Sequence, residues 1–379
     1  MSIVVFILIL SGLVIIHEFG HFIVSKLNGI TVEEFGLGYP PKIFGKKFGD
    51  TLYSINLLPF GGFVKIAGSD IEDEEDEAMY LHDPKSFVNK TAWQKAKVIG
   101  AGAFMNLILA IVLFYIFLGF NNFRSFNIPM FFDHDFKLGL PNYIDTVVFD
   151  MSEDSGALKA GIEAGEAIVE IDGRQVLNID DVRNAVSGKI GQEVELKLLD
   201  IKDRSYDKLR MVKVIPTVGD DGDAVLGVYL GSSVSISYNS SPGQRVLSGP
   251  MHAYNMLSYS LSTLSKIIGV SVETRDISPV SQSVAGPIGI YNVFDSVVKY
   301  GGSKVVLGLI DTVALVSLGF AITNILPFPA LDGGRLVFIA IEGLTKRKVS
   351  SRIEANIHKV GMMLLLALVV LITVKDIFR

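Results

Sequence analysis

Long apolar stretches alternate with polar segments along this chain. Four of them approach or exceed the length of about 20 apolar residues that a helix needs to cross a bilayer. They predict transmembrane helices over residues 1–27, 98–120, 305–334 and 357–374. The second stretch carries no charge, whereas the third carries Asp311 and ends in a segment broken by Pro and Gly. The first lacks a basic leading region and a small-residue cleavage site, so we expect a retained span rather than a signal peptide.

The segment 28–97, between the first two spans, has a strand-like pattern. Runs typical of short strands cover Val32–Phe35, Leu52–Leu57 and Phe63–Ile66, and Gly and Pro residues separate them. We expect a membrane-associated β-hairpin element here, because strand pairing satisfies backbone groups that lipid cannot. Residues 92–97 predict an interfacial helix that leads into the second span.

Residues 141–231 have the pattern of a compact α+β domain. A short helix ending at Gly161 precedes a strand over Ala167–Ile171, and a helix over Asp180–Val186 precedes a strand over Glu193–Leu199. This order resembles a PDZ domain in its circularly arranged bacterial form. The resemblance implies a groove between Ile144–Phe149 and the second helix, where an extended segment could add to a strand edge.

The segment 241–302 is amphipathic and rich in aromatic residues. Its pattern predicts a helix over Met251–Ile268 and an interruption at Gly286-Pro287-Ile288-Gly289. It has no compact domain pattern of its own. We therefore expect an extracytoplasmic linker that lies along the membrane surface.

Basic residues indicate the orientation of the spans. Lysines are concentrated between the first and second spans, and basic residues recur between the third and fourth, at Lys346, Arg347, Lys348, Arg352 and Lys359. Both loops are expected in the cytoplasm by the positive-inside rule, which leaves the PDZ-like domain outside. The acidic run 70–77 has little weight in this rule and is expected to be a solvated, mobile surface segment.

Composition is consistent with several spans plus an aqueous domain. The chain has 379 residues, of which 49% are hydrophobic, and a mean hydropathy of +0.44. Its net charge of -6 provides no broad basic surface, so nucleic acid is not an expected partner. The chain has no cysteine, which excludes disulfides and leaves His, Asp, Glu and water as the ligands of any metal.

One short motif in the first span is typical of metal chemistry. In His17-Glu18-Phe19-Gly20-His21 the histidines are four residues apart, so a helix presents both imidazoles on one face. Glu18 lies beside them, where its carboxylate can accept a proton from a metal-bound water. Ionisable groups at membrane depth are costly and indicate function. A soluble helix with two surface histidines is the disfavoured alternative.

Asp332 is the best candidate for a third metal ligand. A catalytic zinc site usually has three protein ligands and one open position. Pro327, Pro329 and two glycines break the end of the third span, which lets the Asp332 carboxylate turn inward. The alternative for Asp332 is a helix-end residue at the cytoplasmic interface. The other histidines lie in predicted loops or flanks: His82, His134, His252 and His358.

Two asparagines within the apolar stretches have open roles. Asn324 lies one turn before the Pro-broken segment and can bond freed backbone or the backbone of an extended substrate. Asn106 follows small residues in the second span that permit close helix contact, so a packing role is favoured over chemistry.

Together these motifs resemble the bacterial site-2 proteases, intramembrane zinc metalloproteases of the RseP/RasP kind with a single PDZ domain. The resemblance covers nearly the whole chain. It rests on His-Glu-x-x-His, Gly-Gly-Phe-Val-Lys at 61–65, the PDZ-like insert, Gly-Pro-Ile-Gly, and Asn-x-x-Pro-x-Pro-x-Leu-Asp-Gly-Gly. One departure is visible in the second span, where Ala103 replaces the proline of the family's Gly-Pro-x-x-Asn.

The resemblance implies roles for individual residues. His17, His21 and Asp332 would bind Zn²⁺, and Glu18 would be the general base. Substrate binding is implied for residues from two segments, the Pro-broken segment and an edge strand, namely Asn324, Pro327, Pro329, Gly61, Gly62, Phe63 and Val64.

The expected fold is an α-helical polytopic membrane protein of four transmembrane helices, with a membrane-associated β-hairpin element and an extracytoplasmic α+β PDZ domain. The expected activity is hydrolysis of peptide bonds in transmembrane segments, in substrates such as pre-cut anti-sigma factors or remnant signal peptides. The expected partners are single-span membrane proteins and the lipid bilayer of the bacterial cytoplasmic (inner) membrane. The PDZ groove would bind peptide or gate the access of substrate. The alternatives are a membrane zinc protease that cuts soluble or loop substrates, and a non-catalytic PDZ adaptor.

Overall fold

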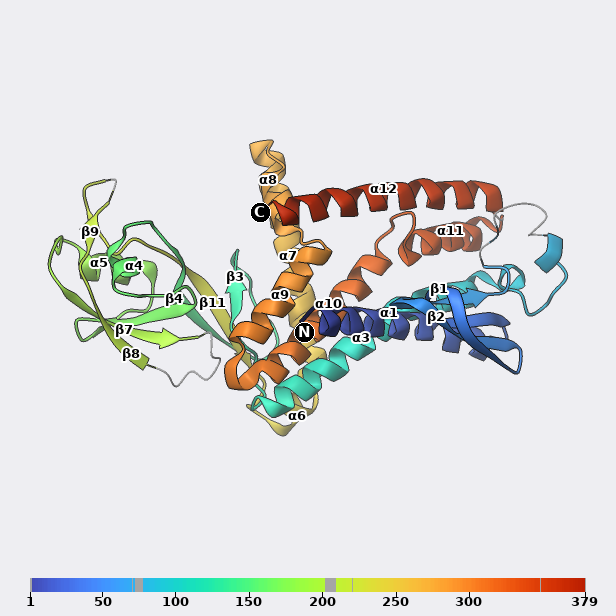
Figure 1. Ribbon diagram of the computed structural model, residues 1–379, viewed down its shortest axis with the longest axis horizontal. Coiled ribbons are helices and arrows are strands. Elements are labelled where there is room, and N and C mark those ends of the chain that lie inside the picture. The colour runs from blue at the N-terminus through green and yellow to red at the C-terminus, as the bar shows by residue number, and fades with distance from the viewer. Residues whose placement is uncertain are drawn as a thin grey trace. The chain divides into compact units, whose positions relative to one another are not determined.

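The computed structural model describes residues 2–69, 71, 78–201, 209–219, 221–347 and 349–378 (Figure 1). The acidic run 70–77 lies, apart from Ile71, outside the described residues. The chain divides into two compact units, which are described separately. Unit 1 contains residues 1–113, 281–295 and 311–379, and unit 2 contains residues 114–280 and 296–310.

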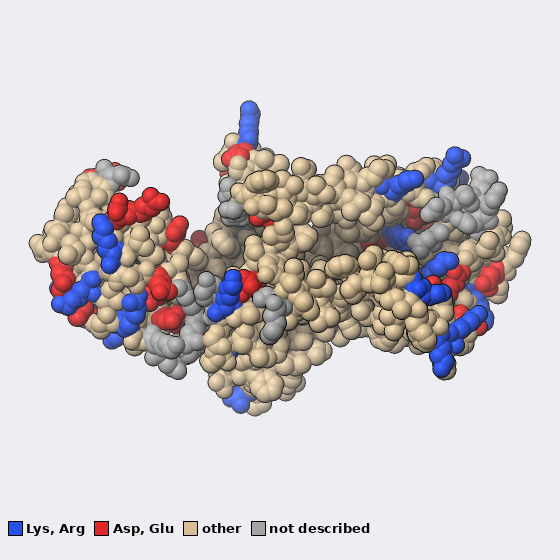
Figure 2. All heavy atoms as spheres, in the orientation of Figure 1, with Lys and Arg blue, Asp and Glu red and all other residues tan. Residues whose placement is uncertain are grey.

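Four long apolar helices account for the predicted spans. They are α1 (Ser2–Leu27), α3 (Ala92–Phe120), α10 (Val305–Ile325) and α12 (Ser351–Ile377). Within the described residues, four helices that coincide closely with these are long and apolar enough to cross a membrane. In Figure 2 the surface over the long helices of unit 1 is nearly free of charged side chains, as a lipid-facing surface requires.

α12 extends beyond its predicted span at both ends, and two other helices also differ from theirs. α3 begins at Ala92, so residues 92–97 continue directly into the apolar helix. The third apolar stretch is divided: α10 ends at Ile325, residues 326–331 are not helical, and α11 (Asp332–Thr345) begins at Asp332. Because the break immediately precedes Asp332, this carboxylate is the first residue of a new helix.

The segment between α1 and α3 forms a sheet from two strands, β1 (Val32–Phe48) and β2 (Thr51–Ile66), followed by the short helix η1 (Phe87–Asn89). Residues 34–37 of β1 pair on both sides. Along 34–37 the residue numbers of the partners fall from 65 to 62 on one side and rise from 52 to 55 on the other. The two strands therefore fold into four pairing segments, in the order 42–48, 51–56, 32–37 and 62–66. The three short strands expected from the sequence are parts of this longer arrangement. Among the described residues, segment 62–66 pairs on one side only, so it is an edge.

Unit 2 contains the predicted α+β domain. Its sheet has the strand order β3-β11-β4-β5-β7-β8, with β6 paired to β5. The strands are β3 (Ile128–Met130), β4 (Leu140–Met151), β5 (Glu166–Ile171), β6 (Arg174–Gln175), β7 (Val194–Asp200), β8 (Leu209–Val214) and β11 (Val228–Ser237). A separate small pair is formed by β9 (Thr217–Val218) and β10 (Ala224–Val225), and the two helices are α4 (Gly156–Lys159) and α5 (Ile179–Val186).

The α+β domain has its own apolar core. The inward faces of β5 and β7 pack with both helices, through residues that include Ile168, Leu196, Ala157 and Val182. One ion pair links β8 to β5: the exposed Arg210 guanidinium donates to both carboxylate oxygens of the buried Glu166, at 2.6 and 2.7 Å. Together with the four apolar helices and the β-hairpin, this domain confirms the predicted fold class.

The groove predicted beside Ile144–Phe149 was wrong in its strand. These residues belong to β4, which is an inner strand of the sheet between β11 and β5. Among the described residues, residues 228–231 of β11 form an open edge, because β3 pairs only with Ser232–Val234. α5 contacts β4, β5 and β10, and β10 immediately precedes β11 in the chain. Sequence order misled the prediction because the strand that provides the edge comes last in the domain.

The predicted linker 241–302 is largely helical. It contains α6 (Pro242–Val246), α7 (Ser248–Thr274), α8 (Ser278–Ser283) and α9 (Pro287–Tyr300), and the short helix η2 (Gly302–Lys304) follows. The Gly-Pro-Ile-Gly turn is the N-terminus of α9. There the Asp376 carboxylate of α12 accepts hydrogen bonds from the backbone N–H groups of Gly286 and Gly289, at 2.9 and 3.0 Å. A carboxylate is well placed at a helix N-terminus because the first N–H groups have no partner within the helix.

Candidate metal centre

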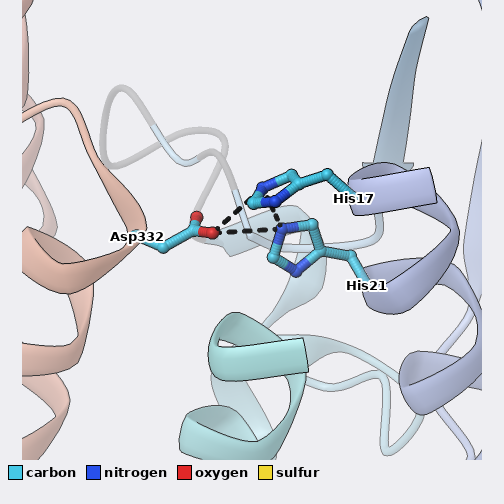
Figure 3. A group of neighbouring side chains, drawn as sticks. All are labelled: His17, His21 and Asp332. Atoms are coloured by element: carbon cyan, nitrogen blue, oxygen red, sulfur yellow. Dashed lines mark hydrogen bonds and ion pairs between the residues drawn. The ribbon is translucent and has the colours of Figure 1, made fainter. Parts of the chain in front are cut away.

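Three potential ligands converge within unit 1 (Figure 3). The His17 and His21 side chains come from α1 and Asp332 from the start of α11, and their ligand atoms lie within 4.8 Å of one another. The Asp332 Oδ2 atom is 3.1 Å from Nε2 of His17 and 3.3 Å from Nε2 of His21. The two Nε2 atoms are 3.1 Å apart. The set of three ligands predicted from the sequence is thus brought together.

These distances fit a tetrahedral zinc ion. Zinc–nitrogen and zinc–oxygen bonds of about 2.0–2.1 Å place two ligands of a tetrahedron about 3.3 Å apart. All three separations are close to that value. The side chains are shielded, with exposed fractions of 12% for His17, 8% for His21 and 18% for Asp332. A buried carboxylate facing two imidazoles is a donor set that a divalent cation stabilises.

The tautomer of His21 is set by a backbone group. Its Nδ1 atom lies 2.8 Å from the Val98 carbonyl oxygen, an acceptor, so Nδ1 carries the proton and donates. Nε2 is then left with its lone pair directed toward His17 and Asp332. This is the usual arrangement for a metal-binding histidine, whose second nitrogen donates to a carbonyl or carboxylate.

Two glycines allow α3 to approach the metal ligands. A Cβ on Gly102 would lie 2.6 Å from Cε1 and 2.7 Å from Nε2 of His17, and would also clash with His21. A Cβ on Gly20, within the His-Glu-x-x-His motif, would clash with the Ala101 carbonyl group. The absence of both side chains lets α1 and α3 pack with their backbones close together, as small residues do in membrane helices. Gly102 therefore forms one wall of the site.

The loop before Asp332 is fixed by α12. Ala330 has a φ of +84°, a strained conformation for a residue with a side chain, and its backbone N–H donates to Nδ1 of His358 at 3.0 Å. Gly361, one turn further along α12, leaves room for Pro329, which a Cβ there would meet at 2.6 Å or less. His358, which the sequence placed near the membrane interface, thus helps to hold the segment that presents Asp332.

Glu18 lies between the metal ligands and the edge segment 62–66. Its carboxylate interacts electrostatically with His17, His21 and Asp332, and the Val64 backbone amide faces it. The preceding turn is held by α1 as well: Ser11 Oγ donates to the Pro59 carbonyl oxygen at 2.8 Å and accepts from the Gly61 N–H at 3.1 Å. The edge of the sheet therefore runs along α1 and ends beside the metal ligands.

The structure also places the remaining residues expected to contact substrate. Asn324 is in the last turn of α10, where its side-chain amide is half-buried and has no hydrogen-bond partner among the described residues. Pro327 is exposed and Pro329 half-buried in the non-helical segment. Gly61 has a φ of +70°, which favours glycine, and Gly62 abuts the Gly36 carbonyl oxygen across the sheet.

Two of the histidines that were set aside, His134 and His252, belong to unit 2. His252 is buried in unit 2, where its Nδ1 lies 2.9 Å from the Tyr238 hydroxyl. Burial lowers the pKa of His252 to about 3, so the ring is neutral and structural. His134 packs against Phe136 and Tyr259.

Three residues at or near the site were not assigned to it from the sequence. Gly102 was recognised as a packing glycine, but nothing in a sequence shows that the atoms it makes room for are imidazole nitrogens. Asn106, one turn further along α3, has its Nδ2 atom 3.5 Å from Nδ1 of His17. His358 looked like a flanking residue because a short apolar stretch begins beside it.

Two imidazoles and a carboxylate, held by closely packed apolar helices next to a glutamate, define a membrane-embedded metalloenzyme. Comparison with known proteins gives its family. A profile of peptidase family M50 matches residues 5–368. The chain belongs to this family and is a multi-pass membrane zinc metalloprotease.

Full-length relatives agree with this assignment. A Clostridium perfringens protein, provisionally named a zinc metalloprotease, is 36% identical over 100% of this chain and 98% of its own length. The regulator of sigma-W protease RasP of Bacillus subtilis is 27% identical over 100% of this chain and 98% of its own length. A solved PDZ domain of an SdrC-like protein from Listeria innocua, at 20% identity, covers 23% of this chain and 92% of that domain with a TM-score of 0.20.

The close approach at Gly102 predicts that a single methyl group there disrupts the metal site. We expect Gly102→Ala to weaken zinc binding by about 100-fold or more, because both imidazoles must move. The matched control is Gly100→Ala, where a Cβ meets nothing within 4 Å. Zinc content after dialysis against a chelator measures the effect. Alanine is the better helix former, so loss of helix stability cannot explain a loss of zinc. Equal zinc retention by the two variants would contradict the role of Gly102 as a wall of the metal site.

Proposed function

We propose that this zinc metalloprotease cleaves peptide bonds within transmembrane segments of membrane proteins. The observation that carries the proposal is the position of the candidate ligands: two lie on an apolar helix of membrane length, the third follows the break after another such helix, and an open strand edge lies beside them. A substrate helix in lipid has all its peptide groups bonded internally, so it must unwind locally before a bond can be cut. A site built for such substrates needs a group that receives the unwound backbone.

Segment 62–66 is the candidate binding site for the unwound substrate backbone. Its free edge can pair with an extended substrate by main-chain hydrogen bonds, independently of the substrate's side chains. Asn324, with its free amide, and Pro327 and Pro329 would line the other side of the substrate. The unwound segment would then lie between the sheet and the broken third span, over the metal ligands.

Different side chains of the chain would carry out the separate parts of hydrolysis. His17, His21 and Asp332 would hold zinc, which when bound supplies Lewis acidity and a water of lowered pKa. Glu18 would accept the proton of the attacking water and return it to the leaving amine. The apolar helices around these residues limit access of bulk water to the site.

The proposed substrates are single-span membrane proteins. The B. subtilis relative is named a regulator of sigma-W, which supports pre-cut anti-sigma factors as one substrate class. Cleavage of soluble or loop substrates is the competing proposal. A purely non-catalytic adaptor is disfavoured because the complete set of ligands and Glu18 are present together.

Glu18→Gln tests the catalytic proposal. We expect cleavage of a model single-span substrate, in detergent or membranes, to fall by at least about a hundredfold, because the amide cannot take a proton. Zinc content should remain that of the wild type, whereas Asp332→Ala should lose zinc. The control is the exposed Glu153→Gln, with wild-type activity expected. Unchanged cleavage by Glu18→Gln would refute the role of Glu18, and cleavage of loop substrates alone would favour the competing proposal.

The edge segment is tested by cross-linking, which the cysteine-free chain makes straightforward. In the Glu18→Gln background, we expect Phe63→Cys to form a disulfide with a cysteine placed near the substrate's cleavage point. The matched control is Phe44→Cys, which is exposed and lies in the 42–48 segment on the opposite side of the sheet. Equal cross-linking at both positions, or none at Phe63→Cys, would argue against edge pairing.

The sides of the membrane can be mapped in the same background. We propose that the α+β domain lies outside the cytoplasm of a bacterial cell, with the metal ligands near the cytoplasmic face. The reason is that the basic loops lie between the first and second spans and between the third and fourth. An impermeant maleimide added to spheroplasts should label Glu153→Cys and leave Lys47→Cys unlabelled. The reverse pattern would invert the proposed orientation.

A further inference from the structure

Asn106 is a buried polar residue for which the hydrolytic scheme has no use. Its side chain is fully buried in α3, and its Nδ2 atom is 3.5 Å from Nδ1 of His17, at the long end of hydrogen-bonding range. Its Oδ1 atom is buried and has no hydrogen-bond partner among the described residues. A buried amide oxygen without a donor is costly and calls for a physical explanation.

The position of Asn106 is fixed from two directions. It lies one helical turn beyond Gly102, so both residues face α1 at the metal ligands. Its backbone carbonyl oxygen accepts a hydrogen bond from the buried Ser317 hydroxyl of α10, at 2.8 Å. α3 is thus tied to α10 at the residue whose side chain reaches His17, and small movements of the amide are restricted.

The position of the proton on the His17 ring determines whether the group facing it must be a hydrogen-bond donor or an acceptor. His17 presents Nε2 to Asp332 and to Nε2 of His21, so Nε2 is its ligand atom. A neutral imidazole that binds metal through Nε2 carries its one proton on Nδ1. The group facing Nδ1 must then be an acceptor. For His21 that acceptor is the Val98 carbonyl oxygen.

We infer that Asn106 is the corresponding acceptor for His17 and a positioning residue of the metal centre. A half-turn of its amide exchanges Nδ2 and Oδ1, which gives the oxygen the donor that it lacks. Oδ1 then accepts from Nδ1–H, fixes the tautomer and ring orientation of His17, and keeps Nε2 free of its proton. This inference rests on the proposed role of His17 as a zinc ligand. It replaces the packing role favoured from the sequence.

A pair of near-isosteric substitutions separates an acceptor from a packing residue. Asn106→Leu keeps the volume and removes the acceptor, and we expect its zinc dissociation constant to rise by about 10–100-fold, the usual effect of losing such a partner. Asn106→Asp keeps acceptor oxygens and loses the N–H donors, and we expect its zinc affinity to stay within about threefold of wild type. Chelator competition on the purified full chain gives both constants. The visible spectrum of the cobalt-substituted protein reports ligand geometry independently of activity.

The outcomes distinguish this inference from the proposed function. Wild-type affinity in a folded Asn106→Leu variant would overturn the inference, as would an Asn106→Asp variant weakened by 10-fold or more, because that result would require the N–H donor. If Asn106→Leu does not fold, Asn106→Asp alone decides. Failure of the wild type to bind zinc, or full activity of Glu18→Gln, would instead refute the proposed function. Retained zinc in Asn106→Leu with an inactive Glu18→Gln would refute only the role of Asn106.

Discussion

The local structure of unit 1 depends on placing a carboxylate and two imidazoles together among apolar helices. Isolated ionisable groups in such surroundings are unfavourable, and a cation shared by all three removes the penalty. The His17–His21 pair needs only one regular helix. Asp332 must come from elsewhere in the chain, so the third apolar stretch is broken between Ile325 and Asp332 and its backbone is bonded locally and to α12. The break in the helix thus brings Asp332 to the two histidines.

Close backbone approach is the second consequence. Glycines occur where a side chain would collide with a backbone group that builds the site: Gly20 against Ala101, Gly333 against Ile325, Gly334 against Phe328 and Gly361 against Pro329. Each contact joins a different pair of segments around the three ligands. Shape complementarity of this kind replaces the hydrophobic driving force that lipid removes from helix association. The ligands are therefore positioned by backbones, which move less than side chains.

The parts of the structure that the sequence predicts are those with a local signal. The spans follow from apolar length, the histidine pair from helical spacing, and Asp332 from the Pro and Gly residues that break its span. The pairing of residues 34–37 with 52–55 has no local signal in the sequence, because each of these segments also pairs with another segment on its other side. The same holds for the edge provided by β11, and for Asn106 and His358, whose partners are 89 and 28 residues away.

α1 contributes to more than metal binding, because one of its faces runs along the sheet. Ser11 holds the Pro59–Gly61 turn, Val14 and Ile15 pack against Gly61 and Gly62, and Glu18 meets the Val64 amide. These positions are three or four residues apart, so they share one face of the helix. The same rigid element thus fixes both the strand edge and two metal ligands. On the proposed edge pairing, the register of a bound backbone relative to the metal is set by α1 and not by the substrate's side chains. Since main-chain pairing is largely indifferent to side-chain identity, selectivity would then depend on how readily a substrate helix unwinds.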